Sequence, residues 1–575
     1  MAITVSPLDR EKRFGVVIDA GSSGSRVQIY AWPDPALGKG GSRLPAVGKN
    51  GETKKHKWHL KVHPGISTFA QHPQDVGVDH LRPLVEHALS IVPPSLVPQT
   101  PLFLLATAGM RLLPATQQTA ILEQACSYAR TYTKFLLPNC EDHFQVINGE
   151  TEGLLGWISI NYMLGALDWP EENDHGKGHS TYGFLDMGGA SAQIAFAPNA
   201  TETTKHEDNL MLLRLRRLNR SLGEYRVFVS TWLGFGADQA HERHMQRLLS
   251  SSSLEDPCMP KHLTAKVNGV EVEGSGSLEQ CLLQTQPLLD KDAPCPDAPC
   301  LFNGTHAPAI DFDVNHFIGV SNFWHASHDV FDMGGAYDYH TYLQRVEKFC
   351  SRDWKDIKKD IKGGKWGKHT NEDDIRESCF KAAWMINVLH DGIGIPRISL
   401  DDGLDTGHNG TKELEDAARH KGFLDPFQSV DEIDNQEVSW TLGKMVLYAS
   451  SQVDAGDNPA PVGYGMNVPG AMFHEAGVKS EEPWSDRLLF RRTPGFLLLA
   501  TIFLVVVFLL LGRERRERAS RSLTSLLKRR KSGLGDEYER VEQGEGWELS
   551  RHTPTTTSRS GSQSVSRTGS RERLA

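Results

Sequence analysis

Residues 18–30 read IDAGSSGSRVQIY and residues 185–196 read LDMGGASAQIAF, and the two segments share one pattern. Each starts with an apolar run, passes through an aspartate into small residues, and ends in a second alternating run. This pattern is typical of a strand, a tight turn and a returning strand, in which small residues let backbone N–H groups surround phosphate oxygens. The repeat therefore predicts two phosphate loops that face one substrate.

The aspartates of the two loops, Asp19 and Asp186, stand at equivalent positions. We expect them to flank the same phosphate chain and to hold a divalent metal directly or through its water molecules. The hydroxyls of Ser22, Ser23, Ser25 and Ser191 add hydrogen-bond donors. A single turn of this kind is more often a plain hairpin, but a plain hairpin has no reason to repeat its acidic residue.

Two further segments lie between the loops. Residues 104–114, LLATAGMRLLP, place Thr107 and Ala108 after an apolar strand, where they either face the same cleft or simply connect a strand to a helix. Residues 146–165 place Glu150 and Glu152 at a glycine-bounded turn before a helix. A carboxylate at a helix entrance is often only a cap that favours the helix dipole.

The length and charge of the chain favour a large folded enzyme over a nucleic-acid-binding protein. Its 575 residues suffice for one or two large cores, and a formal charge of -10 argues against a nucleic-acid surface. Short apolar runs alternate with helical stretches, for example residues 115–135 and 234–250. This alternation predicts a mixed α/β fold.

The cysteines and glycosylation motifs point to an oxidising compartment. The eight cysteines all precede residue 380 without the spacing of a zinc site; they are Cys126, Cys140, Cys258, Cys281, Cys295, Cys300, Cys350 and Cys379. Their even number predicts disulfides, and the alternative is eight unrelated buried thiols in a cytosolic protein. Four Asn-x-Ser/Thr motifs, at Asn199, Asn219, Asn303 and Asn409, are compatible with a lumenal domain.

Residues 494–512, PGFLLLATIFLVVVFLLLG, carry no charge and are long enough to cross a bilayer. Nine Lys and Arg follow within residues 513–531, so the positive-inside rule places the basic tail, residues 513–575, in the cytoplasm. Its polar composition predicts that this tail is disordered. Residues 476–493 form the expected juxtamembrane linker. Residues 1–21 show no apolar signal-peptide segment, so we expect the C-terminal span to drive translocation.

Five segments in order resemble the five shared regions of the apyrase family, the nucleoside triphosphate diphosphohydrolases: DAGSSGSR, ATAGMR, GETEGLLGWISINYMLG, LDMGGASAQIAF and FIGVSNFWHASHDVF. Residues 61–70, 388–396 and 437–445 are also similar to family segments. The resemblance covers residues 14–475. A C-terminal span with a cytoplasmic tail resembles the fungal Golgi branch of the family.

The resemblance implies roles for particular residues. Glu152 matches the general base, while Asp19 and Asp186 match the aspartates that hold Mg²⁺, Ca²⁺ or Mn²⁺, mainly through water. The phosphate-binding residues that it implies are Ser22, Ser23, Gly24, Ser25, Thr107, Ala108, Gly188, Gly189, Ala190, Ser191 and Gln193. Phe323 or Trp324 would stack on the base, although core packing explains either residue equally well.

The resemblance also implies a two-lobed, actin-like (ribonuclease H-like) α/β fold with a C-terminal transmembrane helix. Lobe I would take residues 14–149 plus 436–475, and lobe II residues 150–435, with the active site between them. The implied activity is hydrolysis of the terminal phosphate of nucleoside di- and triphosphates such as GDP, UDP and ATP. It would take place in the Golgi lumen, on a single-pass membrane protein that binds no nucleic acid.

Three questions stay open at this point. Gly24 stands where cell-surface relatives often carry histidine, which leaves the preference between di- and triphosphates undecided. A sugar kinase or exopolyphosphatase of the actin-like superfamily would also carry paired Asp-Gly loops. A nucleotide-gated binding protein with slow turnover is the second alternative, and the partners of the cytoplasmic tail are not predicted.

Overall fold

The computed structural model describes residues 11–477 apart from 38–40, 50, 54–55, 252–253, 368–369 and 399–425. The described residues belong to one compact unit. The predicted membrane span at 494–512, the tail at 513–575 and Asn409 lie outside them. Within the described part, no helix has the length and apolar character needed to cross a bilayer.

The N-terminal part forms a five-stranded sheet in the order β3-β2-β1-β4-β5. Strand β1 pairs antiparallel with β2, and β2 with β3, while β1 pairs parallel with β4, and β4 with β5. The bounds are Lys12–Ala20 (β1), Ser25–Pro33 (β2), His59–Val62 (β3), Leu102–Ala106 (β4) and Phe144–Val146 (β5). The first predicted loop joins β1 to β2, so the predicted hairpin is confirmed.

A second sheet has nine strands in the order β14-β15-β13-β6-β7-β9-β8-β18-β19. Its central strands repeat the first sheet, because β6 pairs antiparallel with β7 and parallel with β13. The bounds are Gly183–Met187 (β6), Ser191–Phe196 (β7), Met211–Arg216 (β8), Leu222–Leu233 (β9), Phe317–Ser321 (β13), Gly335–Ala336 (β14), Phe427–Ser429 (β15), Gly463–Met466 (β18) and Phe473–Glu475 (β19). The second predicted hairpin, β6–β7, is likewise confirmed.

Strand order and direction make the two sheets copies of one plan. The order β9-β7-β6-β13-β15 matches β3-β2-β1-β4-β5, with two antiparallel pairs followed by two parallel pairs in each. The predicted mixed α/β fold is confirmed.

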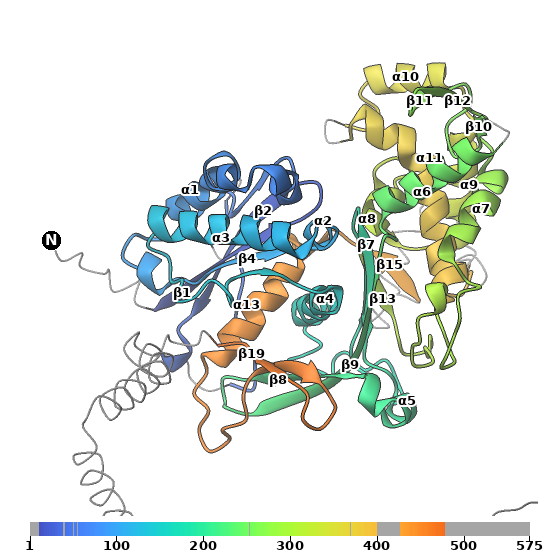
Figure 1. Cartoon of the computed structure of the whole chain (residues 1–575). Helices are drawn as coiled ribbons and strands as arrows, with labels where there is room; N and C mark the ends of the chain where they lie inside the picture. The colour runs from blue at the N-terminus through green and yellow to red at the C-terminus, as the bar shows by residue number, and fades with distance from the viewer. Residues whose placement is uncertain are drawn as a thin grey trace, which may run out of the picture. The chain divides into compact units, whose positions relative to one another are not determined.

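Helices cover the outer face of each sheet and fill the space between the sheets (Figure 1). Outside the first sheet lie α1 (Arg82–Ile91) and α3 (Ala115–Tyr132), whose apolar residues share a core with β1. Between the sheets lie α4 (Gly149–Met163) and α13 (Trp440–Ser451), which share a second core with both sheets.

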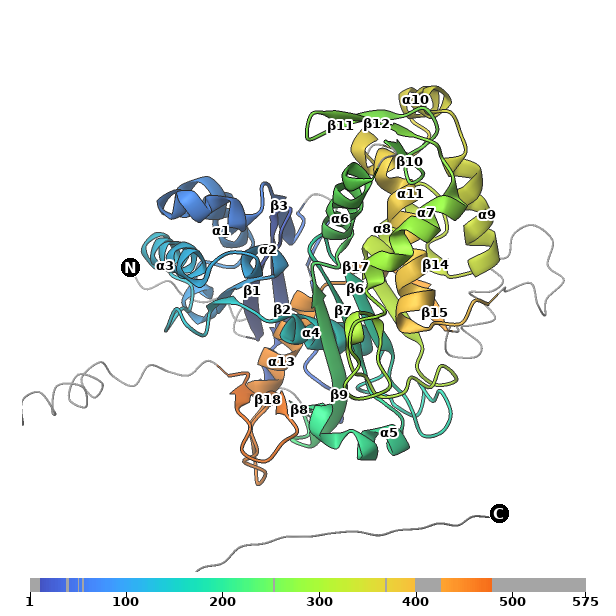
Figure 2. The same ribbon diagram turned by 45° about the vertical axis from the view of Figure 1, so that its right-hand side comes forward.

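A third core covers the other face of the nine-stranded sheet, where helices gather around α11 (Figure 2). Its helices are α6 (Ala237–Ser250), α7 (Leu278–Thr285), α8 (Asn322–His328), α9 (Tyr339–Cys350), α10 (Trp354–Lys362) and α11 (Glu372–Ile386). Two further short helices are α2 (Ala108–Arg111) and α5 (Ala200–Lys205). A small sheet consists of β10 (Glu255–Asp256), β11 (Thr264–Val267) and β12 (Val270–Gly274), and β16 (Glu432–Ile433) pairs with β17 (Gln436–Glu437). Short 3-10 and π helices, such as Ile66–Gln71 and Asn387–Ile393, complete the described secondary structure.

The segment 436–475, which we predicted to complete lobe I, divides in the structure. Helix α13 packs between the sheets, whereas β18 pairs with β8 and β19 extends the nine-stranded sheet. Backbone pairing with the exposed edge of β8 explains this return to the larger sheet. The division into lobes at residues 149 and 436 stays a prediction.

All eight cysteines form disulfides, as the sequence predicts. The pairs are Cys126–Cys140, Cys258–Cys281, Cys295–Cys300 and Cys350–Cys379. No cysteine of the chain is left free.

Helices α4 and α13 cross in close contact because a glycine lies at the crossing. A Cβ atom on Gly443 would collide with the carbonyl of Leu155. Overpacking a buried contact costs about 1–3 kcal/mol. We expect Gly443→Ala to lower the free energy of unfolding by about that amount in urea titrations followed by circular dichroism.

Gly41→Ala is the matched control, because a Cβ there meets no atom within 4 Å. The control should stay within about 0.5 kcal/mol of wild type, as surface substitutions usually do. Equal stability of the two variants would contradict the close-crossing interpretation.

Candidate active site

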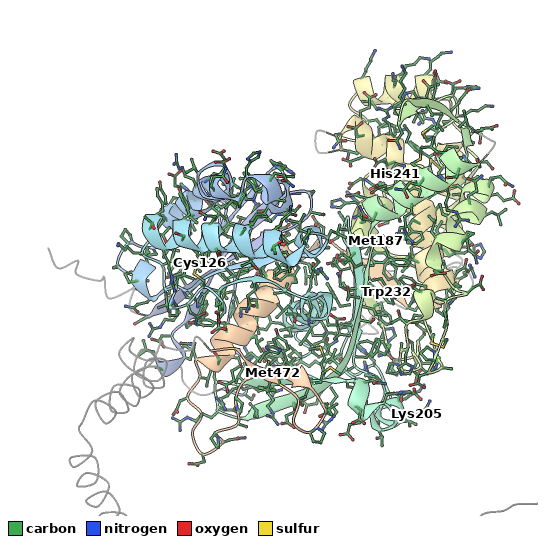
Figure 3. The ribbon with its side chains drawn as sticks, in the orientation of Figure 1. Cys126, Met187, Lys205, Trp232, His241 and Met472 are labelled. Atoms are coloured by element: carbon green, nitrogen blue, oxygen red, sulfur yellow. A yellow bond between two sulfur atoms is a disulfide. The ribbon has the colours of Figure 1, made fainter. Side chains whose placement is uncertain are left out.

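The two hairpin loops face each other across a cavity of about 540 Å³. Most of the residues predicted from the sequence line this cavity: Asp19, Ser22, Ser23, Gly24, Thr107, Ala108, Glu152, Asp186, Gly188, Gly189, Ala190 and Ser191. Met187, at the end of β6, marks the position of the second loop in Figure 3. Segments separated by more than 160 residues in sequence thus meet in one place.

Close packing holds the first loop in shape. The Gly21 N–H donates to the Gly24 carbonyl at 3.0 Å, which closes the turn. A Cβ on Gly65 or Gly109 would collide with the backbone of Ser22, so these glycines let neighbouring segments press against the loop. The backbone of the loop therefore lies open only toward the cavity.

The second loop rests on the N-terminus of α6. The N–H groups of Ala237 and Asp238 donate to the carbonyls of Gly188 and Gly189 at 2.9 and 3.0 Å. The Gly188 N–H donates to the Ser191 carbonyl at 3.0 Å, which closes this turn in the same way as the first. The carbonyls are thus turned away into the protein, and small side chains border the cavity.

Glu152 lies in the first turn of α4, whose N-cap Asn148 accepts a hydrogen bond from the Thr151 N–H. Its side chain is buried, and Oε2 accepts hydrogen bonds from Arg111 Nη2 at 2.5 Å and Gln193 Nε2 at 3.4 Å. Burial raises the pKa of Glu152 to about 8, although Arg111 opposes the shift. A buried carboxylate with a pKa near neutrality has the properties of a general base.

Three acids share the cavity, and each keeps its proton more tightly than usual. Loss of hydration raises the pKa of Asp19 to about 7, with Arg26 opposing and Asp186 adding to the rise. Burial also raises the pKa of Asp186, whose Oδ1 has no hydrogen-bond partner among the described residues. Oxygen ligands with crowded negative charge and an unpartnered buried oxygen fit a divalent cation.

Two predicted phosphate-binding residues, Ser25 and Gln193, are not among the residues that line the cavity. Ser25 is buried beside β1, and its hydroxyl lies 2.7 Å from His80 Nε2. The Gln193 amide donates to Ser191 Oγ at 2.6 Å and to Glu152, so it borders the cavity from behind.

The two aromatic residues proposed for base stacking are occupied by protein contacts. Phe323 is buried, and its ring packs 5.6 Å from that of Phe427. Trp324 stacks on His328 with ring centroids 4.3 Å apart. Phe323 is therefore a core residue, which was the alternative interpretation of the sequence. Base stacking by Trp324 stays a prediction.

Two residues of the site that the sequence analysis quoted without singling them out, Arg111 and Trp440, contact its acidic residues. Arg111 lies one helical turn after Thr107, and its Nη2 donates hydrogen bonds to Glu152 and Ser191. Trp440, the first residue of α13, lines the cavity and hydrogen-bonds to Asp19. Arg111 ends the quoted ATAGMR segment, but no spacing in the sequence indicates which carboxylate it meets.

Comparison with known proteins identifies the family of the chain. The profile of the GDA1/CD39 (nucleoside phosphatase) family matches residues 5–457. The chain belongs to this family. The resemblance to apyrases drawn from the sequence is therefore confirmed, and the nucleoside phosphatase family makes the protein an enzyme.

Curated relatives of this nucleoside phosphatase span most of its length. The Golgi apyrase of Saccharomyces cerevisiae is 36% identical over 93% of this chain and 88% of its own length. The Golgi apyrase of Schizosaccharomyces pombe is 40% identical over 77% of this chain and 76% of its own. Nucleoside-diphosphatase mig-23 of Caenorhabditis elegans is 32% identical over 76% and 78%.

Solved structures are more distant. A nucleoside triphosphate hydrolase structure from Neospora caninum aligns with a TM-score of 0.44 at 13% identity, over 76% of this chain and 92% of that one. A Ppx/GppA structure from Aquifex aeolicus aligns with a TM-score of 0.33 at 11% identity, over 66% and 90%. The account of this nucleoside phosphatase therefore rests on its own strand order and site.

Proposed function

We propose that the protein hydrolyses the terminal phosphate of nucleoside diphosphates and triphosphates by direct attack of water, releasing the monophosphate and inorganic phosphate. GDP and UDP are the principal substrates, and ATP is a further one. The observation that carries this proposal is the meeting of two Asp-Gly loops with the buried Glu152 in one cavity. Relatives named Golgi apyrase and nucleoside-diphosphatase support it.

The reaction depends on a divalent cation, Mg²⁺, Ca²⁺ or Mn²⁺. Asp19 and Asp186 hold this ion, mainly through its water ligands, and the unpartnered Asp186 Oδ1 supports that role. When bound, the ion neutralises charge on the phosphate oxygens.

The protein's own groups bind and orient the phosphates. Small residues on both loops leave backbone N–H groups accessible, and the hydroxyls of Ser22, Ser23, Thr107 and Ser191 add donors. Arg26 and Lys61 also line the cavity and attract the polyphosphate. These preorganised donors stabilise the charge that develops on the transferred phosphoryl group.

Glu152 accepts the proton of the attacking water. Gln193 and Arg111 both donate to its Oε2, so they fix the orientation of the carboxylate toward the cavity. General-base help of this kind contributes about 10²- to 10⁴-fold to the rate. No covalent phosphoenzyme is needed, because the nucleophile is water.

The compartment that we propose is the Golgi lumen, with the chain anchored by residues 494–512 and its tail in the cytoplasm. Four disulfides support an oxidising lumen. There, glycosyltransferases leave GDP or UDP behind, and hydrolysis to the monophosphate removes that inhibitory product. The enzyme thereby supports protein glycosylation.

A substrate and metal survey tests the proposal. Purified protein should release phosphate from GDP and UDP with Mg²⁺ or Ca²⁺ over many turnovers and without any acceptor. Chelation should abolish the release because the acids then lack their counter-ion, and adding metal back should restore it. A requirement for an acceptor would indicate a kinase instead, and a single turnover would indicate a nucleotide-gated binding protein.

Removal of the proposed base tests the mechanism. Glu152→Gln should lower kcat by at least about 10²-fold while nucleotide binding, measured by calorimetry, is largely kept, because the amide cannot accept the proton. Glu150→Gln is the matched control, since Glu150 lies in the same helical turn outside the cavity lining. Near-normal hydrolysis by Glu152→Gln would remove the assigned base.

Burial raises the pH at which the base works, and Arg111 lowers it. Glu152 acts only when deprotonated, so activity is lost as the pH falls through its pKa, which is about 8. Arg111 lowers this pKa, so Arg111→Met should move the acidic limb of kcat/KM to higher pH by about one pH unit or more. Arg111→Lys keeps the charge and should move the limb much less, whereas equal limbs in both variants would contradict the charge effect.

A further inference from the structure

A second group of metal-ligating side chains lies at the end of α5, outside the residues that line the catalytic cavity. One ligand atom from each of His206, Asp297 and His306 lies within 4.8 Å of the other two. His206 is buried, His306 is half-buried and Asp297 is exposed. Figure 3 labels Lys205, the last residue of α5 and the neighbour of His206 in sequence.

The two imidazoles face each other through ring nitrogens. His206 Nδ1 lies 3.2 Å from His306 Nε2. On the far side of its ring, His306 Nδ1 lies 2.7 Å from the Asp297 carbonyl oxygen. A carbonyl only accepts, so the Nδ1 of His306 carries the ring hydrogen and its Nε2 presents a lone pair toward His206.

His206 has an acidic group on the corresponding side of its ring, although the structure shows no hydrogen bond between them. Its Nε2, on the side away from His306, lies 3.3 Å from a carboxylate oxygen of Glu202, one helical turn earlier. A hydrogen on Nε2 suits that carboxylate, and then Nδ1 also presents a lone pair. A hydrogen on Nδ1 would instead bond to His306 but leave the buried Nε2 lone pair against the carboxylate. A cation between the facing nitrogens removes this conflict.

The surroundings match those of histidines that bind zinc. Such a histidine usually donates its other ring N–H to a carboxylate or a backbone carbonyl. The Asp297 carbonyl takes this place for His306, and the Glu202 carboxylate lies beside the corresponding nitrogen of His206, in ion-pair contact and without a hydrogen bond. Two nitrogens bound to a tetrahedral zinc ion at ~2.0–2.1 Å lie about 3.3 Å apart, close to the 3.2 Å between the facing nitrogens.

We propose that His206, His306 and Asp297 bind one Zn²⁺ ion, with water as the fourth ligand. Two imidazoles and a carboxylate are a donor set that zinc accepts readily. The second cluster of this kind, His244, Asp256 and Cys258, is not proposed, because the sulfur of Cys258 is bound to Cys281.

The ion links two segments that are remote in sequence. His206 follows α5, whereas Asp297 lies in the loop closed by the Cys295–Cys300 disulfide and His306 follows that loop. His206 precedes Asp297 by 91 residues, and Asp297 precedes His306 by 9, so no short sequence motif predicts the site. Zinc would hold this disulfide loop against the end of α5.

Zinc content measured in excess Mg²⁺ tests the proposal, because Mg²⁺ would fill the cation site of the proposed function. Full-length protein equilibrated with Zn²⁺ and freed of excess metal should retain one Zn²⁺ per chain by mass spectrometry. His306→Gln and Asp297→Asn should lose it, and Zn²⁺ should raise the melting temperature of wild type but not of these two variants. Glu202→Gln should weaken Zn²⁺ binding by about 10- to 100-fold, as loss of such orienting groups does.

His262→Gln is the matched control, since His262 pairs with Asp353 at the surface and belongs to neither cluster. It should keep the full zinc content. Asp297 is exposed, so Asp297→Asn tests the site even if substitution of His306 impairs folding. Equal zinc content in wild type and Asp297→Asn would overturn the proposal. Wild type that retains no zinc would overturn it as well, and would indicate that the imidazoles share a proton.

Discussion

The close crossing of α4 and α13 is the contact on which the site depends. Gly443 lets the two helices touch between the sheets, and each helix delivers a residue to the cavity from its N-terminus. Glu152 comes from the first turn of α4, and Trp440 begins α13. Because both helix N-termini carry partial positive charge, this packing also favours an anionic substrate.

The sequence predicts the hairpins well because their pattern is local. The apolar runs around Asp19 and Asp186 decide the strands, and the small residues between them decide the turns. Proximity of the two loops follows from the repeat, since equivalent strands of two sheets with one plan face a common cavity. The local pattern therefore fixes both the elements and the main members of the site.

Side-chain contacts between residues far apart in sequence could not be predicted from the sequence. Arg111 and Glu152 are 41 residues apart, and only packing brings them within hydrogen-bonding distance. Ser25 belongs to the loop motif, yet its hydroxyl turns to His80, because alternate residues of a strand point to opposite faces. Phe323 is aromatic and follows a strand, but its side chain packs in the core against Phe427. The antiparallel pairing of β18 with β8 is a further long-range contact that no local sequence pattern predicts.

The positions of the disulfides leave the two sheet regions free of any covalent cross-link between them. Cys126–Cys140 lies within the part built around the five-stranded sheet, whereas Cys258–Cys281 and Cys350–Cys379 lie among the helices that cover the nine-stranded sheet. Cys295–Cys300 closes a short loop that lies near the end of α5. None of the four joins one sheet region to the other. Oxidation therefore stiffens each half separately, and the width of the gap between the phosphate loops is left to noncovalent forces. The enzyme thus gains stability without covalently locking the cleft through which product must leave.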